Sequence, residues 1–437
     1  MLKGKTVAPL TLGCKVNQYE TDGMIELLKE AGMTVVSFEE KADVYLINTC
    51  SVTNMADKKS RQMIHRAKKL NPDAVVIAAG CYVQAAKDKL MEDDRISIII
   101  GNNKKKDIVQ ILEDYLEIGV TDEGMLDIAA EKEYEPLTIN STLEHTRAYV
   151  KIQDGCNQFC SYCIIPYVRG RIRSRELASI TEEVERLAQT GVKEIVLTGI
   201  HISSYGKDKE NEVGLADVID AISKIESIER IRLGSLEPGI ITDTFIDRIV
   251  DNKKVCPHFH LSLQSGCNTV LKRMNRKYTC EEYFEKCEML RKAFDRPALT
   301  TDVIVGFPGE TDEEFQETVD YLTKLNLYEM HIFKFSPRQG TVAAGMRDQI
   351  GPEIKNQRSD VLLALSEKNK HAYEASFRGE TLEVLIEEKV RRNGKDGYRG
   401  HTERYIDIFV EEECMHRICG REVDIINHIV QIPYGME

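Results

Sequence analysis

The first quarter of the chain alternates short apolar runs with amphipathic segments. Apolar runs rich in β-branched residues cover 6–12, 43–48, 74–79 and 96–100. After the first run, Met24, Leu27, Leu28 and Ala31 recur at helical spacing, and a basic helix is expected over 57–70. Buried strands separated by amphipathic helices predict a parallel sheet covered on both faces. We therefore predict an α/β domain over residues 1–115.

The same alternation resumes after residue 144. Predicted strands cover 148–152, 194–199, 230–234, 258–263, 300–305 and 331–335, with helices such as 181–189 and 312–325 between them. Six such units, assigned to residues 144–372, are too few for a closed eight-stranded barrel. His260 and His331 fall on apolar strands and are interpreted as core histidines.

Two further segments differ in composition. Residues 116–143 are acidic and irregular, which predicts a linker. Residues 375–437 contain short strands over 381–386, 404–410 and 421–425, separated by glycines, the pattern of a small β-barrel. Its candidate nucleic-acid contacts are Lys389, Arg391, Arg392, Arg399 and Tyr405. The alternative is a purely structural cap.

Length and composition indicate a folded protein of several domains. A chain of 437 residues is expected to divide into two or three domains, and 42% apolar with 30% charged residues is typical of globular proteins. We find no apolar run near the roughly 18 residues of a membrane span and no signal-peptide core, so we expect a cytoplasmic location and no membrane partner. Twelve cysteines in such a chain favour metal ligation over disulfides.

Three of these cysteines lie close together. Cys156, Cys160 and Cys163 have the spacing C-x3-C-x2-C directly after a predicted strand. Such a loop can present three thiolates to one iron–sulfur cluster. Three ligands on a four-iron cluster leave one iron open, which favours chemistry at that iron. A zinc site is the main alternative, but no second cysteine pair follows; three buried apolar side chains are the other alternative.

This motif resembles the radical S-adenosylmethionine (SAM) superfamily. The resemblance implies a [4Fe-4S] cluster on the three cysteines, whose open iron binds the amino and carboxylate groups of SAM and whose electron cleaves SAM to a 5′-deoxyadenosyl radical. It implies that Phe159 and Tyr162 shield the cluster and line the adenine side. The six strand–helix units fit the six-stranded partial (β/α) barrel of that superfamily.

Later strand-end motifs suggest further SAM contacts. Residues 235–238, 264–266 and 306–310 are similar to motifs of the superfamily, so Glu237 and Gln264 are candidates to bind SAM, or else structural hydrogen-bond partners. Residues 199–206 stand where many members have Gly-Gly-Glu, which leaves the contact to the SAM amino group unassigned.

A second set of cysteines is dispersed in sequence. Cys14, Cys50 and Cys81 each follow a predicted parallel strand. Because the carboxyl ends of parallel strands share one edge, we expect the three thiols to converge there. The functional interpretation is a second iron–sulfur cluster with three protein ligands; chance placement is the alternative.

The runs 11–18, 48–50 and 79–81 resemble the amino-terminal domain of the methylthiotransferases, a radical-SAM family with two [4Fe-4S] clusters. The resemblance covers essentially the whole chain. It implies insertion of a methylthio group into a C–H bond of a tRNA adenosine or a ribosomal-protein aspartate, with sulfur carried at the second cluster and a methyl group from a second SAM. It also implies that residues 375–437 are a TRAM domain, which binds tRNA.

The run 12–21 most resembles the branch that modifies carbon 2 of N6-threonylcarbamoyladenosine beside the tRNA anticodon. The branches that act on isopentenyladenosine and on a ribosomal protein remain alternatives. The implied partners are the tRNA anticodon loop, an external electron donor and a sulfur source.

The overall charge argues against a nucleic-acid partner, but its distribution does not. The net charge is −13, whereas basic residues cluster over 58–69, 169–175, 272–277 and 389–392. Most such clusters are solvated faces. The cluster at 169–175 adjoins the first cysteine motif, so it either contacts an anionic substrate or supports the site. A tRNA-binding protein with structural clusters, and a radical-SAM enzyme that only methylates, also remain open.

Overall fold

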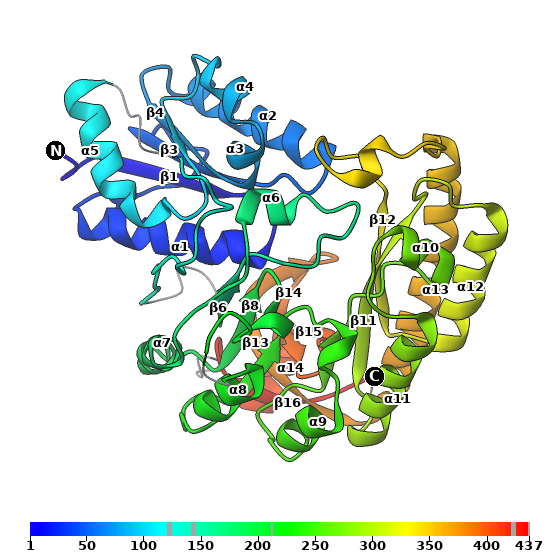
Figure 1. Cartoon of the computed structure of the whole chain (residues 1–437). Coiled ribbons are helices and arrows are strands. Elements are labelled where there is room, and N and C mark those ends of the chain that lie inside the picture. Colours follow the sequence, from blue (N-terminus) through cyan, green and yellow to red (C-terminus); the bar gives the residue numbers. More distant parts are fainter. Residues whose placement is uncertain (120–124, 141–145, 211–212, 421–424, 436–437) are drawn as a thin grey trace.

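A computed structural model describes residues 1–119, 125–140, 146–210, 213–420 and 425–435 (Figure 1). The chain forms an α/β molecule with a parallel amino-terminal sheet, a six-stranded curved core and a small antiparallel carboxyl-terminal sheet. Among the described helices, none combines the length and apolarity needed to cross a bilayer.

The amino-terminal sheet has five parallel strands in the order β2-β1-β3-β4-β5. The strands are β1 Thr6–Thr11, β2 Thr34–Val35, β3 Val44–Thr49, β4 Val75–Gly80 and β5 Ile98–Ile100. The helices of this unit are α1 Lys15–Glu30, α2 Asn54–Leu70, α3 Cys81–Ala85, α4 Lys87–Met91, the 3-10 turn η1 Lys105–Asp107 and α5 Ile108–Ile118. Both faces of the sheet carry an apolar cluster, as expected for strands apolar on both sides. The predicted strands and the helix with Met24 and Leu28 are confirmed.

Six parallel strands form the core. They are β6 Arg147–Asp154, β8 Glu194–Gly199, β9 Arg230–Leu233, β10 His258–His260, β11 Ala298–Val305 and β12 Glu329–Lys334. Backbone bridges from Ile231 to Val255 and from Leu236 to Leu261 join the β6-β8-β9 half to the β10-β11-β12 half. The predicted six-stranded partial barrel is confirmed. A short antiparallel strand, β7 Arg173–Ser174, adds to β6 and was not anticipated.

The short elements α6 Ile165–Arg169, α10 Asn268–Arg273 and the 3-10 turns η2 Ile202–Ser204, η3 Pro238–Ile240 and η4 Val342–Gly345 lie in the segments that follow the strands, and α6 packs against α3. The outer face of this partial barrel is covered by the helices α7 Leu177–Gln189, α8 Leu215–Ser223, α9 Asp243–Ile249, α11 Cys280–Ala293, α12 Asp312–Leu325 and α13 Pro352–Ala375. The main apolar core lies between these helices and the strands, and it includes Cys287, one of the cysteines outside both triads.

The carboxyl-terminal unit is a curled antiparallel sheet in the order β15-β14-β13-β16. Its elements are β13 Thr381–Arg392, β14 Lys395–Thr402, β15 Asp407–Glu411, the helix α14 Glu412–Cys419 and β16 Ile429–Pro433. The sequence did not predict β14, α14 or β16. A Cβ at Gly397 would lie 2.4 Å from the Val410 carbonyl oxygen, and one at Gly400 would lie 2.1 Å from that of Leu385. These glycines therefore permit close strand packing where their spacing suggested turns.

Part of the predicted strand over 421–425 lies outside the described residues, and Ile425 itself is buried but not in a strand.

This small sheet closes the amino ends of the core strands. Arg230 donates to the carbonyl oxygens of His401 (3.0 Å) and Glu383 (2.9 Å), and Arg232 donates to those of Glu403 and Thr402. The Tyr405 ring lies 4.9 Å from the Arg232 guanidinium. Tyr405 therefore belongs to this junction, whereas the sequence placed it among nucleic-acid contacts.

The segment predicted as a linker is irregular where it is described, but it is packed. Leu137 and Ile139 are buried in the main core, and the Tyr19 hydroxyl of α1 donates to the Leu137 carbonyl oxygen at 2.6 Å. This segment therefore fastens the amino-terminal unit onto the partial barrel.

Candidate active site between two cysteine triads

The first triad lies in the loop that leaves the carboxyl end of β6. Gly155 opens this loop at φ +72°, and a Cβ there would stand 1.8 Å from the Arg171 carbonyl oxygen. The Cys156 amide donates to the Gly170 carbonyl oxygen at 3.0 Å. The loop is thus held against the chain that follows it, and its shape requires glycine at 155.

The three thiols of this loop influence one another electrostatically. Burial, together with the neighbouring Cys160, raises the pKa of Cys156 to about 11 and that of Cys163 to about 12. These two thiols would carry protons near neutral pH unless a metal ion displaced the protons. Metal binding at this loop would therefore release protons.

Arg276 supplies a positive charge at Cys160, the second thiol of this loop. Its guanidinium donates to Cys160 Sγ at 3.2 Å and to Glu237 Oε1 at 2.6 Å. Burial opposes ionisation of Glu237, but the nearby His201, whose Nε2 is 3.6 Å from Glu237 Oε1, and the charge of Arg276 outweigh it, so the pKa of Glu237 is lowered. The sequence placed Arg276 in a basic run of the kind that usually faces solvent, whereas the structure makes it part of the site.

The four predicted SAM-contact residues lie in this loop or next to it: Phe159 and Tyr162 belong to the loop, and Glu237 and Gln264 follow later strands. Glu237 lines a cavity of about 660 Å³ together with Gln158 and His201. Tyr162 and Gln264 line a second cavity of about 230 Å³ that also reaches Cys163. Phe159 packs edge-on against Tyr167, with ring centres 5.8 Å apart, under the Arg171 guanidinium. Phe159 at φ +49° and Gln264 at φ +77° adopt the left-handed backbone that non-glycine residues rarely accept, a feature common at functional sites.

The second triad converges as the strand order predicts. Cys14 precedes α1, Cys50 follows β3, and Cys81 opens α3 directly after β4. A Cβ on Gly13 would lie 2.9 Å from Cys50 Sγ. Burial, with contributions from the nearby Cys81 and Cys14, raises the pKa of Cys50 to about 11, so the three thiols lie close enough to interact electrostatically.

The three thiols form one donor set. Cys14 as a residue is exposed, whereas burial of its thiol is the main cause of its raised pKa. Gly80 adopts φ +95°, and a Cβ there would lie 2.4 Å from Asn48 Oδ1. Only glycine therefore lets the chain before Cys81 pack this closely against β3. The donor set of three thiols suits an iron–sulfur cluster.

A buried ionic network joins the second triad to the barrel. Arg169 Nε lies 3.3 Å from Cys81 Sγ, and its guanidinium also donates to Glu20 (2.6 Å) and Asp154 (3.2 Å). Lys151 and Lys105 complete the shell of Glu20 at 2.7 and 2.8 Å. Arg173 and Arg175 are buried as well. Of the two interpretations of the basic run 169–175, the structure therefore supports the structural one for these three arginines.

One expectation about the barrel histidines is wrong. His331 is exposed on the edge strand β12, and the buried Nε2 of His260 has no hydrogen-bond partner among the described residues. Neither is a satisfied core histidine. The pattern of apolar strand residues could not reveal that the interior of a partial barrel is open at its edge.

Comparison with known proteins decides the family. Residues 150–322 match the radical SAM superfamily, and residues 6–101 match uncharacterized protein family UPF0004. The chain is 42% identical over 430 residues to threonylcarbamoyladenosine tRNA methylthiotransferase MtaB of Bacillus subtilis, covering 98% of this chain and 93% of that protein. The chain belongs to the radical-SAM methylthiotransferases.

Other relatives agree with this membership. The tRNA-2-methylthio-N(6)-dimethylallyladenosine synthase of Thermoanaerobacter pseudethanolicus is 36% identical over 427 residues, covering 94% of this chain and 89% of that one. Among solved structures, the radical SAM methyltransferase TsrM of Kitasatospora setae has a TM-score of 0.57 at 16% identity, covering 78% of this chain and 77% of that one. At that identity the likeness shows the fold alone. Membership of the radical-SAM methylthiotransferases implies a [4Fe-4S] cluster and SAM.

Proposed function

We propose that this protein is a tRNA methylthiotransferase that acts at carbon 2 of N6-threonylcarbamoyladenosine beside the anticodon. The observation that carries the proposal is the near full-length similarity to an MtaB enzyme, at 42% identity. The presence of both cysteine triads on facing edges of two units supports it, because methylthiolation needs two centres held near one substrate.

We assign Cys156, Cys160 and Cys163 to a [4Fe-4S] cluster that binds SAM, and Cys14, Cys50 and Cys81 to a second [4Fe-4S] cluster. When bound, these groups supply hydrogen abstraction at the target carbon and the methylated sulfur that replaces it. The protein's own residues hold the two centres at a fixed separation, through the Arg169 network and the packed segment around Leu137. An external electron donor and a sulfur source complete the reaction.

Within the first site, Glu237 and Arg276 form a buried acid–base pair at Cys160. Arg276 donates toward the thiol sulfur, so it stabilises a thiolate there. Glu237, Tyr162 and Gln264 line the cavities in which SAM would lie, and Phe159 is proposed to shield the cluster from the same loop. A carboxylate such as Glu237 can accept hydrogen bonds from hydroxyl or ammonium groups of the cofactor.

The tRNA surface is proposed to include α2. Lys58, Lys59, Arg61 and Lys69 of this helix are exposed. The helix begins beside the barrel, where Arg338 pairs with Asp57 at 2.6 Å. This basic face could therefore hold phosphates while the anticodon loop enters between the triads.

The carboxyl-terminal sheet is proposed as a second tRNA contact. Its exposed cations are paired with carboxylates, as in Lys389 with Glu412 (2.6 Å) and Arg399 with Asp407 (2.8 Å). Arg391 and Arg392 also have acidic neighbours, at 3.8 Å. Exposed pairs of this kind contribute only about 0–1 kcal/mol, so phosphates can replace them at little cost. A tRNA substrate implies a cytoplasmic enzyme.

The deciding experiment is mass spectrometry of tRNA nucleosides from a strain that lacks this gene, complemented with the wild-type gene or with Cys50→Ala. We expect the 2-methylthio derivative of N6-threonylcarbamoyladenosine to disappear in the deletion strain and to return only with the wild-type gene. Loss of the methylthiolated dimethylallyl nucleoside instead would move the enzyme to the other tRNA branch. An unchanged tRNA profile would refute the proposal.

A further inference from the structure

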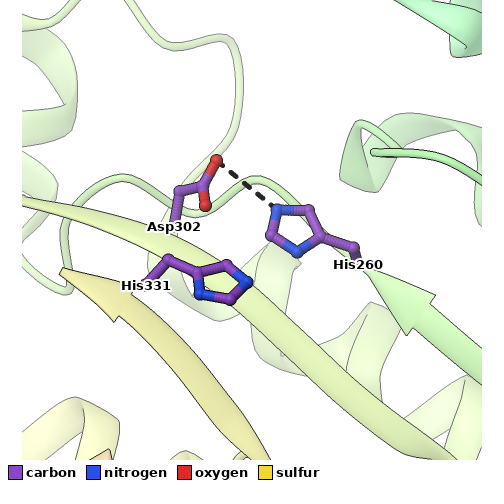
Figure 2. Close-up of side chains that lie close together, drawn as sticks. All are labelled: His260, Asp302 and His331. Carbon is purple, nitrogen blue, oxygen red and sulfur yellow. Dashed lines mark ion pairs between the residues drawn. The ribbon is translucent and has the colours of Figure 1, made fainter. Parts of the chain in front are cut away.

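Three polar side chains gather inside the partial barrel, away from both cysteine triads. His260, Asp302 and His331 come from the neighbouring strands β10, β11 and β12, and Figure 2 shows them turned toward one another. One nitrogen or oxygen of each lies within 4.8 Å of the others. The ring centres of the two histidines are 5.7 Å apart, and His260 Nε2 is 3.5 Å from Asp302 Oδ2.

The alternation along β11 explains why these groups face the interior. Thr301, Val303 and Val305 are fully buried toward the helices, so Asp302 and Ile304 point the other way. The Asp302 carboxylate lines the 230 Å³ cavity that also contains Tyr162, Cys163 and Gln264. Asp302 therefore connects the three polar side chains to the hollow beside Cys163.

The group has unused hydrogen-bonding capacity. His260 Nδ1 is 3.1 Å from Thr300 Oγ1, whereas its Nε2 makes no hydrogen bond among the described residues. The His331 side chain is exposed.

The chemistry of the candidate substrates differs where this hollow ends. A threonylcarbamoyl group on the adenine carries a carboxylate, a hydroxyl and urea N–H groups, whereas a dimethylallyl group is a hydrocarbon. Imidazole N–H groups donate to a carboxylate, and Asp302 can accept from a hydroxyl or a urea N–H. Burying a dimethylallyl group here would instead leave the buried His260 Nε2 without a partner, which costs about 1–3 kcal/mol.

We propose that His260, Asp302 and His331 form the recognition site for the threonylcarbamoyl arm of the substrate nucleoside. His331 and the Nε2 of His260 donate to the carboxylate of the arm, and Asp302 accepts from the urea or hydroxyl. The proposal rests on the proposed function and deepens it, because it names the residues that select this nucleoside over its hydrocarbon counterpart.

The test compares two synthetic anticodon stem-loop RNAs, one with N6-threonylcarbamoyladenosine and one with its carboxylate blocked as the methyl ester. Binding to the cluster-reconstituted enzyme is measured by competition in fluorescence anisotropy. Wild-type protein is expected to prefer the free acid by about 10- to 100-fold, the range for a hydrogen-bonded charge. His331→Phe, which keeps a ring and removes its polar nitrogens, should bring this ratio close to one, and Asp302→Asn should weaken both RNAs.

His371→Phe is the matched control, because His371 is an exposed histidine on α13. It should keep the wild-type ratio. His331→Gln, which restores an N–H donor, should recover part of the preference and guards against a folding defect in the Phe variant. The proposal is overturned if His331→Phe keeps the full preference for the acid.

Two further outcomes separate this proposal from others. Two imidazoles and a carboxylate are also a common ligand set for Zn²⁺ or Fe²⁺. One metal ion per chain beyond the cluster iron, lost in His331→Phe, would overturn the proposal and assign the group to a metal. If wild-type enzyme prefers the acid but transfers no methylthio group to it, the recognition site stands and the proposed reaction fails.

Discussion

Replacing Glu20 with Gln should destabilise the protein more than any ordinary polar substitution. The Glu20 carboxylate is fully buried and lies within 2.8 Å of Lys105, Lys151 and Arg169. Gln has the same shape but removes the negative charge, so cations remain buried without it. Breaking a buried ion pair from one side typically costs about 3–5 kcal/mol.

The assay is urea unfolding of the reconstituted enzyme, with Glu182→Gln as control. Glu182 is exposed on α7, so its replacement should change the free energy of unfolding by no more than about 0.5 kcal/mol. If Glu20→Gln is no less stable than Glu182→Gln, the network does not hold the two units together.

The same carboxylate sets a pH dependence. Burial opposes ionisation of Glu20, but Arg169, Lys105 and Lys151 outweigh it and hold its pKa well below the ordinary value of 4.5. The stabilisation by ionised Glu20 is therefore complete above about pH 4.5 and is lost as the pH falls through the lowered pKa. Between those values, wild-type stability should fall with pH, and Glu20→Gln should lack this part of the decline.

Three further predictions concern the two triads and the tRNA surface. Cys160→Ala should abolish formation of 5′-deoxyadenosine from SAM, whereas Cys50→Ala should retain it and lose methylthio transfer; retained transfer in Cys50→Ala would remove the second cluster from the mechanism. The Arg276→Met variant should retain its cluster iron but bind SAM roughly 10-fold more weakly, because one charged hydrogen bond is lost. Equilibrium dialysis with SAM measures this affinity. The double variant Lys58→Glu, Lys59→Glu should weaken tRNA binding, and the slope of log affinity against log salt concentration should fall by about two released counterions. An unchanged slope would exclude α2 from the interface.

The sequence reveals both triads because their geometry follows from local rules. Cys156, Cys160 and Cys163 share one loop, and the other three cysteines end parallel strands that share an edge. Neither inference needs the tertiary packing of side chains. The partial barrel follows similarly from the count of strand–helix units.

The charged residues around the triads could not be assigned in this way. Arg169 and Arg276 stand in basic runs, and such runs usually face solvent. Their burial depends on Glu20, Asp154 and Glu237, which are distant in sequence, so no local pattern distinguishes them. The strand β14 was missed for a different reason, since Gly397 and Gly400 are required by close strand contact and not by a turn.

The composition of the buried network explains why it adjoins the second triad. Among the described residues, the buried cations Lys105, Lys151, Arg169 and Arg173 form ion pairs with two carboxylates, Glu20 and Asp154. The carboxyl of Glu135 is buried near both lysines, but burial raises its pKa, so ion-paired positive charge still exceeds ion-paired negative charge. An uncompensated buried cation is costly. Arg169 points its Nε at Cys81 Sγ, so a thiolate there supplies part of the missing negative charge. Cysteines that become thiolates on binding a cluster would complete this balance, and loss of the cluster should loosen the junction between the amino-terminal unit and the barrel.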